Sequence, residues 1–500
     1  MQERKEWSKS KISIDQVEME EYILSDQVRA NGRTTTATLS AEGQLRWAER
    51  RLDMEKQVLG FSVEGLKIKI RAVVEATAGI CCSSGKQPLI RKNFTLELSS
   101  DDSVRLWTQK LQEYLDSLGR PKRLFIFVNP FGGKKSASKI FVNDVKPLLD
   151  DANVECTVQE TKCQLHAKEV VQSLDLENYD GIVCVSGDGI LVEVLNGLLI
   201  RKDWNNAIRK PLGAVPAAYL AKRKDIDAQR TGNGMVKSLL DLCGEPCAAS
   251  NATVSIIRGL VADIDIESEK YRWMGSARLD FYCFECECYR KYICSALQRI
   301  FCLRKYNGSI IFVPAPGFES YGEPLDLETQ IIVDAESDMR TNDKHFKTEE
   351  CGYQGPKYGM KSLNWRKVDG PFVSVWLHNV PWGSEGTMAA PDAQFSDGYL
   401  DLIMIKDCPK LSLLKLMTEL NSGDHVKFPF VSYLKVKAFV LQPGSRTNDP
   451  TKGGIIDVDG EVLARGNGAY KCEGKTLMSY DKLLIKVDQG LATLFSPKVA

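Results

Sequence analysis

The residues best suited to chemistry are Ser186, Gly187, Asp188 and Gly189, which follow a short apolar run from Ile182 to Val185. A continuous apolar run of this length is typical of a strand that is buried on both faces of a parallel sheet. Open α/β sheets bind ligands just beyond the carboxyl ends of such strands. The two glycines lack Cβ atoms, so two substrates can approach the backbone and the carboxylate together. The alternative is an ordinary strand-to-helix turn in which the aspartate serves as the helix N-cap.

Two more glycine loops follow the same order of strand, loop and helix. Asn129-Pro-Phe-Gly-Gly-Lys-Lys comes after the apolar run from Leu124 to Val128, and Thr231-Gly-Asn-Gly precedes a helical pattern. Backbone N–H groups at the start of a helix, with a cation nearby, suit a phosphate group. Three such loops on one edge of a sheet favour a nucleotide site. The repeated order predicts a doubly wound α/β domain.

The residue types near these loops limit the chemistry. The chain has four histidines (His166, His345, His378 and His425), which lie far apart in the sequence and disfavour a histidine-rich metal site or a histidine-centred hydrolase. An aspartate can instead orient a hydroxyl group and accept its proton, while phosphate-binding loops and Mg²⁺ neutralise the transferred phosphoryl group. The loops and the aspartate therefore indicate a kinase that acts on an alcohol.

The composition excludes several classes of protein. Lysine and arginine together number 66, as do aspartate and glutamate, so no net charge draws the chain to nucleic acid. The first residues lack the apolar core of a signal peptide, and no apolar run is long enough to span a membrane. The 15 cysteines are odd in number and follow no regular framework, which is typical of reduced thiols in the cytosol.

The chain is expected to divide into a tail and three domains. Residues 1–37 are polar without periodicity, which predicts a mobile tail. Residues 38–118 alternate at period two and close with a helix that begins at Asp101, an order similar to a pleckstrin-homology-like module. Such a module is either an adaptor for a membrane or a partner, or a structural lid. Residues 119–248 hold the glycine loops, and the frequent strands of residues 249–500 predict a β-sandwich-like domain.

Several motifs together resemble the diacylglycerol-kinase-like lipid kinases. They are Asn129-Pro-Phe-Gly-Gly-Lys-Lys, Ser186-Gly-Asp-Gly-x-x-x-Glu-Val-x-Asn-Gly, Thr231-Gly-Asn-Gly and Asp457-Val-Asp-Gly-Glu. The segment from Leu260 to Arg272 narrows the resemblance to sphingosine kinases, also called long-chain-base kinases. Arg278, Val313-Pro-Ala-Pro-Gly and Thr451-Lys-Gly-Gly-Ile-Ile look like the plant branch of that family. The resemblance runs from about Thr38 to the end of the chain and implies an α/β catalytic domain followed by a β-sandwich-like lipid-binding domain.

The resemblance implies a role for each matching position. Asp188 would take the proton from the primary hydroxyl of the lipid, and Ser186, Gly187, Gly189 and Asp265 would border the same substrate. Glu193 and the pair Asp457 and Asp459 are candidate neighbours of Mg²⁺, and the sequence leaves open which of them touches the metal. The residues expected around the nucleotide are Asn129, Pro130, Phe131, Thr161, Glu193, Thr231, Gly232, Arg272, Arg278, Asp459, Gly460 and Glu461.

The carboxylate of Asp265 favours a substrate with a positive charge. A long-chain base presents an ammonium group beside its reactive hydroxyl, whereas a diacylglycerol does not. Leaving a buried carboxylate unpaired costs about 3–5 kcal/mol, which rejects a neutral lipid by roughly two orders of magnitude or more. The alternative is that Asp265 caps the helix that follows it. Arg272 and Arg278 suit phosphate oxygens, and their alternative is surface ion pairing with Glu267 or Glu269.

The expected function is ATP-dependent phosphorylation of sphingoid long-chain bases (sphingosine, sphinganine and phytosphingosine) to the 1-phosphate, with Mg²⁺. The protein is expected in the cytoplasm. Because its substrate is insoluble, it is expected to bind membrane surfaces peripherally, at the vacuole or another endomembrane. No nucleic acid is expected as a partner. Two alternatives stay open. One is a kinase for another lipid alcohol, diacylglycerol or ceramide, and the other is a catalytically impaired splice variant that only binds lipid or nucleotide.

Three departures from the family pattern motivate the second alternative. Residues 218–230 interrupt the approach to Thr231, and residues 283–295 form a second insertion that contains four cysteines. A stretch of paired strands is missing after Gly259, which is expected to expose sheet edges. Clean differences of this kind are typical of a splice variant or an imperfect gene model.

Overall fold

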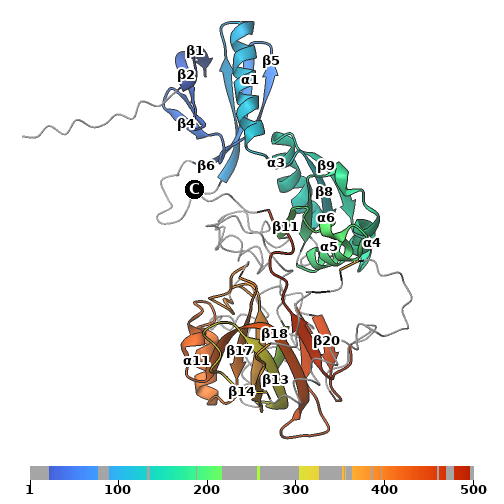
Figure 1. Cartoon of the computed structure of the whole chain (residues 1–500). Coiled ribbons are helices and arrows are strands. Elements are labelled where there is room, and N and C mark those ends of the chain that lie inside the picture. The colour runs from blue at the N-terminus through green and yellow to red at the C-terminus, as the bar shows by residue number, and fades with distance from the viewer. Residues whose placement is uncertain are drawn as a thin grey trace, which may run out of the picture. The chain divides into compact units, whose positions relative to one another are not determined.

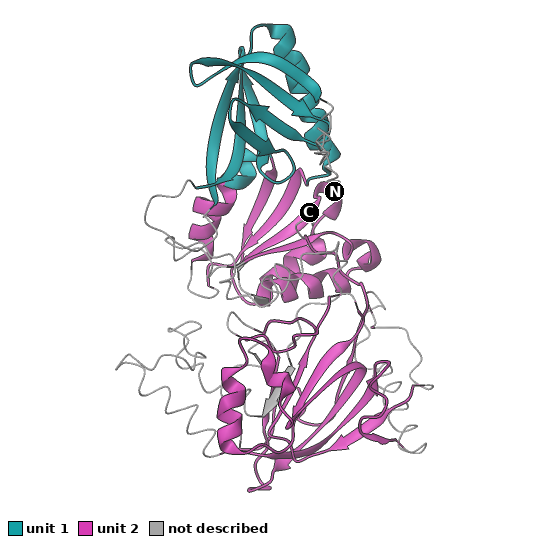
Figure 2. Cartoon of the chain, turned by 90° about the vertical axis from the view of Figure 1, so that its left-hand side faces the viewer, with its two compact units in different colours: residues 1–120, 148–153 teal, residues 121–147, 154–500 magenta. Residues whose placement is uncertain are grey.

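The computed structural model describes residues 22–76, 89–131, 136–186, 188–216, 256–259, 303–325, 352–353, 355, 363–383, 387–395, 397–458, 461–468 and 478–495. The chain forms two compact units, as Figure 2 shows. The first unit contains residues 1–120 and 148–153, and the second contains residues 121–147 and 154–500. The described strands of these units form a seven-stranded, a four-stranded and a 10-stranded sheet.

The first unit is an antiparallel sheet closed by one long helix. The helix α1 (Asp101–Ser117) begins after Ser100, whose side chain accepts a hydrogen bond from the N–H of Ser103, and it buries Val104, Trp107 and Leu111 against the sheet. These elements confirm the predicted β-rich module, and its closer likeness to a pleckstrin-homology-like module stays a prediction. The strands, in the order β4-β3-β2-β1-β7-β6-β5, are β1 (Tyr22–Ala30), β2 (Arg33–Ser40), β3 (Gln44–Trp47), β4 (Arg50–Asp53), β5 (Val58–Glu64), β6 (Lys67–Glu75) and β7 (Leu89–Glu97).

The prediction of a mobile tail up to residue 37 is wrong for residues 22–37. Strands β1 and β2 pair around Asn31 and Gly32, whose φ angles of 52° and 80° are those of a tight hairpin turn. Leu24 and Val28 of β1 face the core. The intervening positions carry mostly small or polar residues, so the period-two signal was weak, although the Asn-Gly pair itself marks a hairpin.

Residues 148–153 belong to the first unit, although the sequence placed them in the α/β domain. The guanidinium of Arg71 donates a hydrogen bond of 2.8 Å to the side chain of Asn153. The guanidinium of Arg91 forms an ion pair of 2.7 Å with Asp151. These contacts explain why the segment clusters with the first unit.

The second unit begins with a parallel sheet in the order β11-β10-β8-β9 (Figure 1). The chain passes from β8 outward to β9, then returns to the other side of β8 with β10 and continues to β11, which confirms the predicted doubly wound α/β fold. The elements are β8 (Arg123–Val128), α2 (Ala137–Ile140), the π-helix η1 (Phe141–Val145), α3 (Lys146–Asp151), β9 (Glu155–Glu160), α4 (His166–Ser173), η2 (Leu176–Asn178), β10 (Gly181–Ser186), α5 (Asp188–Ile200), α6 (Trp204–Ala207) and β11 (Leu212–Pro216).

The 10-stranded sheet follows and is antiparallel, as expected for the second predicted domain. β12 pairs with β16 on one side and β19 on the other, so the strand beside the missing segment is not a sheet edge. The elements are β12 (Ile256–Gly259), β13 (Tyr306–Pro314), β14 (Glu323–Pro324), β15 (Arg366–Asp369), β16 (Ser374–His378), β17 (Leu400–Ile405), α11 (Lys410–Thr418), η8 (Asp424–Lys427), β18 (Val431–Arg446), β19 (Ile455–Val458), β20 (Glu461–Arg465) and β21 (Leu483–Lys486).

Two expectations from composition can be compared with these elements. Cys156, Cys163, Cys184 and Cys408, the cysteines that the structure describes, are free thiols. Among the helices in the described ranges, none is both long and apolar enough to cross a bilayer.

Two buried histidines lie in the second unit. His378 ends β16, and His425 lies in η8 with its Nε2 atom 3.0 Å from the carbonyl oxygen of Ala389. The ring of His425 also packs 5.7 Å from that of Trp376. Burial lowers the pKa of His378 to about 3 and that of His425 to about 4. Both rings are therefore neutral in the folded protein at neutral pH.

These histidines predict acid sensitivity. Below the ordinary histidine pKa of 6.5 the unfolded chain binds protons that the folded chain does not, so stability is lost as the pH falls toward 4. At pH 5 each histidine is expected to cost about 2 kcal/mol of unfolding free energy. Urea unfolding between pH 7 and pH 5 measures this slope, which we expect to be flatter in His378→Gln and in His425→Gln. An unchanged slope in both variants would assign the acid sensitivity to other groups.

Candidate functional site

The carboxyl ends of β8 and β10 lie side by side at the point where the strand order reverses. Ligands of open α/β sheets bind in the crevice at such a point. Asn129 follows β8, and Asp188 begins α5 after β10. The backbone N–H of Asn129 donates a hydrogen bond of 3.2 Å to the carbonyl oxygen of Val185. The structure thus brings the first two of the three predicted loops together at one edge of the sheet.

The loop after β8 is held by its own asparagine. The side-chain oxygen of Asn129 accepts a hydrogen bond of 3.0 Å from the N–H of Phe131, a turn typical of asparagine. Phe131 is 63% exposed, and the ring of Pro130 restricts the backbone between them. The aromatic ring is therefore accessible to a ligand at the edge of the sheet.

The loop after β9 begins at Thr161, which is buried and whose N–H donates a hydrogen bond of 2.9 Å to the carbonyl oxygen of Val128. The helix α4 follows, and no side chain of its own caps its first turn. Glu193 of α5 supplies that acceptor, because its carboxylate accepts the N–H of Ala167 at 3.2 Å. A negative charge at a helix N-terminus is stabilising. Glu193 thus joins α4 to α5. The sequence predicted a place near the nucleotide for this residue but did not predict its contact with α4.

The helix α5 carries Asp188 at its first position and is apolar around most of its circumference. Its buried side chains include Ile190, Leu191, Val194 and Leu198. The unsatisfied N–H groups of the first turn give this end of the helix a partial positive charge. An anionic group that lies in the crevice is therefore stabilised beside the backbone of Asp188.

The two glycines of α5 have different surroundings. A Cβ atom added to Gly197 would lie 2.7 Å from the carbonyl oxygen of Lys168 in α4, so only glycine permits the close approach of the two helices. A Cβ atom added to Gly189 would meet no described atom within 4 Å. Gly189 thus has no close neighbour among the described atoms at the predicted substrate side, whereas Gly197 has a packing role.

The structure does not describe every predicted site residue. The side chains of Ser186 and Asp188 are not described, although their backbones are, and the side chain of Glu461 is likewise outside the description. The insertions at residues 218–230 and 283–295 lie outside the described residues as well. The roles of all these residues stay predictions. Those that fall wholly outside are Gly187, Thr231, Gly232, Asp265, Arg272, Arg278, Asp459 and Gly460.

The carboxylates considered for Mg²⁺ are partly described. Glu193 contacts the start of α4, and Asp457 of β19 is fully buried within the sheet. Within the described residues, no group of three or more histidines, cysteines, aspartates or glutamates is placed to hold a metal ion. The described carboxylates therefore form no metal cage by themselves.

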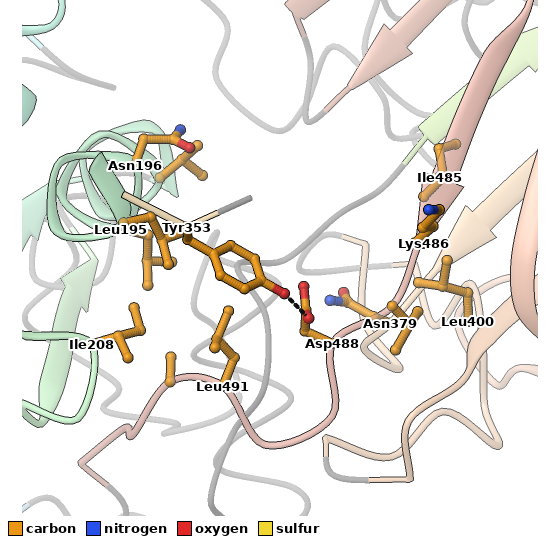
Figure 3. A pocket seen from close by; sticks show the side chains of 14 residues that line it. Leu195, Asn196, Ile208, Tyr353, Asn379, Leu400, Ile485, Lys486, Asp488 and Leu491 are labelled. Atoms are coloured by element: carbon orange, nitrogen blue, oxygen red, sulfur yellow. Dashed lines mark hydrogen bonds between the residues drawn. The ribbon is translucent and has the colours of Figure 1, made fainter. Parts of the chain in front are cut away.

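Sequence reasoning missed one contact with α5. Tyr353 lies in a polar, charged stretch of the sequence that predicts no regular element, yet its N–H donates a hydrogen bond of 2.7 Å to the carbonyl oxygen of Leu199. A cavity of about 260 Å³ adjoins Tyr353 (Figure 3). The only local signal was an aromatic residue after a glycine, Gly352, in an otherwise polar segment.

Two family models match the chain in the order that the fold predicts. The diacylglycerol kinase catalytic domain matches residues 123–218, which contain β8 to β11. The YegS C-terminal NAD kinase beta sandwich-like domain matches residues 361–478, which contain β15 to β20.

Similar proteins extend over nearly the whole chain. Sphingosine kinase 1 of Arabidopsis thaliana is 54% identical over 505 residues, which cover 95% of this chain and 97% of the relative. Sphingosine kinase 2 of the same plant is 54% identical over 507 residues, which cover 95% of this chain and 98% of the relative. Ceramide kinase of Homo sapiens is 29% identical over 436 residues, which cover 78% of this chain and 76% of the relative.

The contrast between the two glycines of α5 can be tested by stability. Gly197→Ala places a methyl group against Lys168 of α4, and such overpacking is expected to cost about 1–3 kcal/mol. Gly189→Ala is the matched control, because its methyl group meets open space and alanine favours a helix. Thermal unfolding should show a lower midpoint for Gly197→Ala alone. Equal midpoints for the two variants would contradict the packing role of Gly197.

Proposed function

This chain belongs to the sphingosine kinase family, and from that premise we propose that it transfers the γ-phosphoryl group of ATP to the primary hydroxyl of a sphingoid long-chain base. The observation that supports the proposal most directly is the parallel pairing of β8 with β10, because their carboxyl ends lie side by side and are followed by Asn129 and by Asp188, the first residue of α5. The product is the 1-phosphate of the base, and ADP is released.

In this proposal Asp188 is the general base. Its carboxylate accepts the proton of the lipid hydroxyl as the hydroxyl oxygen attacks the γ-phosphorus. The bond between that phosphorus and the oxygen that bridges it to the β-phosphate breaks as the new bond forms. The N-terminus of α5 lies beside Asp188 and stabilises the negative charge of the transferred group. Gly189 leaves room for both substrates at this point.

The proposed nucleotide site surrounds the same edge of the sheet. Asn129, Pro130 and Phe131 follow the end of β8, and Thr161 follows the end of the neighbouring strand β9. Thr231, Gly232, Arg272 and Arg278 are proposed to hold phosphates, and Asp459, Gly460 and Glu461 to close the site. Mg²⁺ would be bound in part by phosphate oxygens and water, as is usual where it accompanies a nucleotide.

The lipid specificity is proposed to depend on Asp265, whose carboxylate pairs with the ammonium group of the base. The similarity to a human ceramide kinase keeps a neutral lipid alcohol as the alternative substrate. The insertions near Thr231 and in residues 283–295 keep a chain that binds without catalysis as the other alternative. We further propose that the protein works in the cytoplasm on membrane surfaces, where its insoluble substrate lies.

A labelled-phosphate assay separates these functions. With ATP labelled at the γ position and sphinganine, diacylglycerol and ceramide tested in parallel, we expect label in sphinganine alone. Asp188→Ala should lower the rate at least about 100-fold, because a positioned base contributes about 10²–10⁴. Asp101→Ala, an exposed acid of α1, is the matched control and should leave the rate unchanged. Label in ceramide would support the alternative kinase, and an absence of label in all three would refute catalysis by this chain.

The role of Asp265 has its own test. Asp265→Asn removes the charge that pairs with the ammonium group, so we expect kcat/KM for sphinganine to fall by roughly 100-fold. Activity toward a neutral lipid should change much less. Glu267→Gln, a nearby acid in the same segment, is the control. An equal loss on charged and neutral lipids would show that Asp265 does not select the substrate.

A further inference from the structure

The end of α5 opposite Asp188 is held by Gly352 and Tyr353. The last carbonyl groups of a helix have no partner within it, and the N–H of Tyr353 satisfies that of Leu199 at 2.7 Å. A Cβ atom on Gly352 would lie 2.8 Å from the same oxygen and 3.0 Å from the Cα atom of Ile200, and its φ of +112° also favours glycine. The segment thus lies directly against the helix backbone.

The side chain of Tyr353 joins two other elements to this contact. Its ring packs 4.8 Å from that of Trp204 in α6. Its hydroxyl donates a hydrogen bond to the carboxylate of Asp488, which follows β21. Figure 3 shows Tyr353 between the side chains of α5 and Asp488. Burial raises the pKa of Asp488, and the bond from Tyr353 opposes that shift.

From Asp488 the chain continues into the α/β sheet. The N–H of Leu212, at the start of β11, donates a hydrogen bond of 2.9 Å to the carbonyl oxygen of Thr493, and the N–H of Phe495 donates one of 2.8 Å to the carbonyl oxygen of Leu212. Leu494 and Ala492 join the hydrophobic core of β10 and α5. These attachments lie at the start of β11 and the end of α5, at the edge of the sheet opposite Asp188.

A cavity of about 260 Å³ lies beside this junction and is lined by α5, by β21 and by the segment that follows β21. Leu195 and Asn196 line it from α5, and Lys486 and Leu491 line it from the other side. Close packing is therefore interrupted here, and the polar contacts of Tyr353 cross the gap. A helix of 13 residues is about 20 Å long and stiff, so a rotation at this end displaces the other end.

We propose that Tyr353 is a positioning residue for phosphoryl transfer, which holds the far end of α5 on Asp488 and thereby fixes the place of Asp188 in the crevice. Tyr353 touches neither substrate. A misplacement of the reacting groups by about 1 Å can cost about 100-fold in rate. The inference rests on the proposed function for its kinetic consequence, and on the described contacts alone for the anchoring of α5.

The kinetic test uses variants that differ by single groups. Tyr353→Phe removes only the hydroxyl, and we expect kcat to fall about five- to tenfold with the KM values for ATP and sphinganine within twofold. Asp488→Ala should have the same effect, and the double variant should be no worse than either. Asp488→Asn, which can still accept the hydrogen bond, should restore most of kcat. Tyr321→Phe, at a 43% exposed tyrosine, is the matched control and should leave kcat unchanged.

A second measurement does not need activity. Amide hydrogen exchange of residues 192–200 should be about five- to tenfold faster in Tyr353→Phe than in the parent, with the exchange of β17 unchanged. Unchanged exchange, or additive losses of kcat in the double variant, would overturn the proposal. If the parent transfers no phosphate, the proposed function fails, and the exchange result alone then decides whether Tyr353 anchors α5.

Discussion

The candidate site depends on the parallel pairing of β8 with β10. In this register Val128 lies opposite Val185, so the two strands end at the same level and the loops that follow them begin side by side. β9 and β11 pair on the outer sides, and the chain therefore leaves the sheet in opposite directions at this point. The turn at Asn129 and the start of α5 at Asp188 are consequences of that register. A shift of one strand by one residue would separate them.

The helix α5 connects the end of β10 to the rest of the second unit through its packing contacts. A helix that is apolar around most of its circumference must be largely buried, and α5 packs on β10, on α4 and on the segment after β21. Its few polar side chains each have a place in this packing. Glu193 caps α4, and Asn196 lines the cavity near Tyr353. Asp188, at the end that faces the crevice, is the one that remains for chemistry in the proposed function.

The sequence predicted those features that have a local cause. Continuous apolar runs located β8 and β10. The helix predicted to begin at Asp101 matches α1 for the same reason, since its apolar face is a local pattern. The hairpin at Asn31 was missed because its strands carry a weak pattern, although the turn signal was present.

Other features have no local cause and could not be predicted. The contact of Tyr353 with Leu199 and the pairing of Leu494 with Leu212 join residues that are more than 100 positions apart. The residue pattern of neither segment indicates which distant residue it contacts. Glu193 shows the same limit within the site, because the resemblance implied a place near the nucleotide, whereas its contact with Ala167 depends on how α4 packs on α5. The roles assigned to the site residues came from the resemblance to a family rather than from spacing.

The return of the chain after β21 has a consequence for how the site is maintained. Leu494 and Ala492 lie in the same core as Ile182 of β10 and Leu198 of α5, so residues from both ends of the second unit complete the packing of the helix that carries Asp188. That core therefore includes residues that follow β21, the last strand of the 10-stranded sheet. The position of Asp188 is therefore coupled to the second sheet through packing at the edge opposite the crevice. In the proposed function, this coupling holds the backbone of Asp188 in place while the two substrates bind at the carboxyl edge of the sheet.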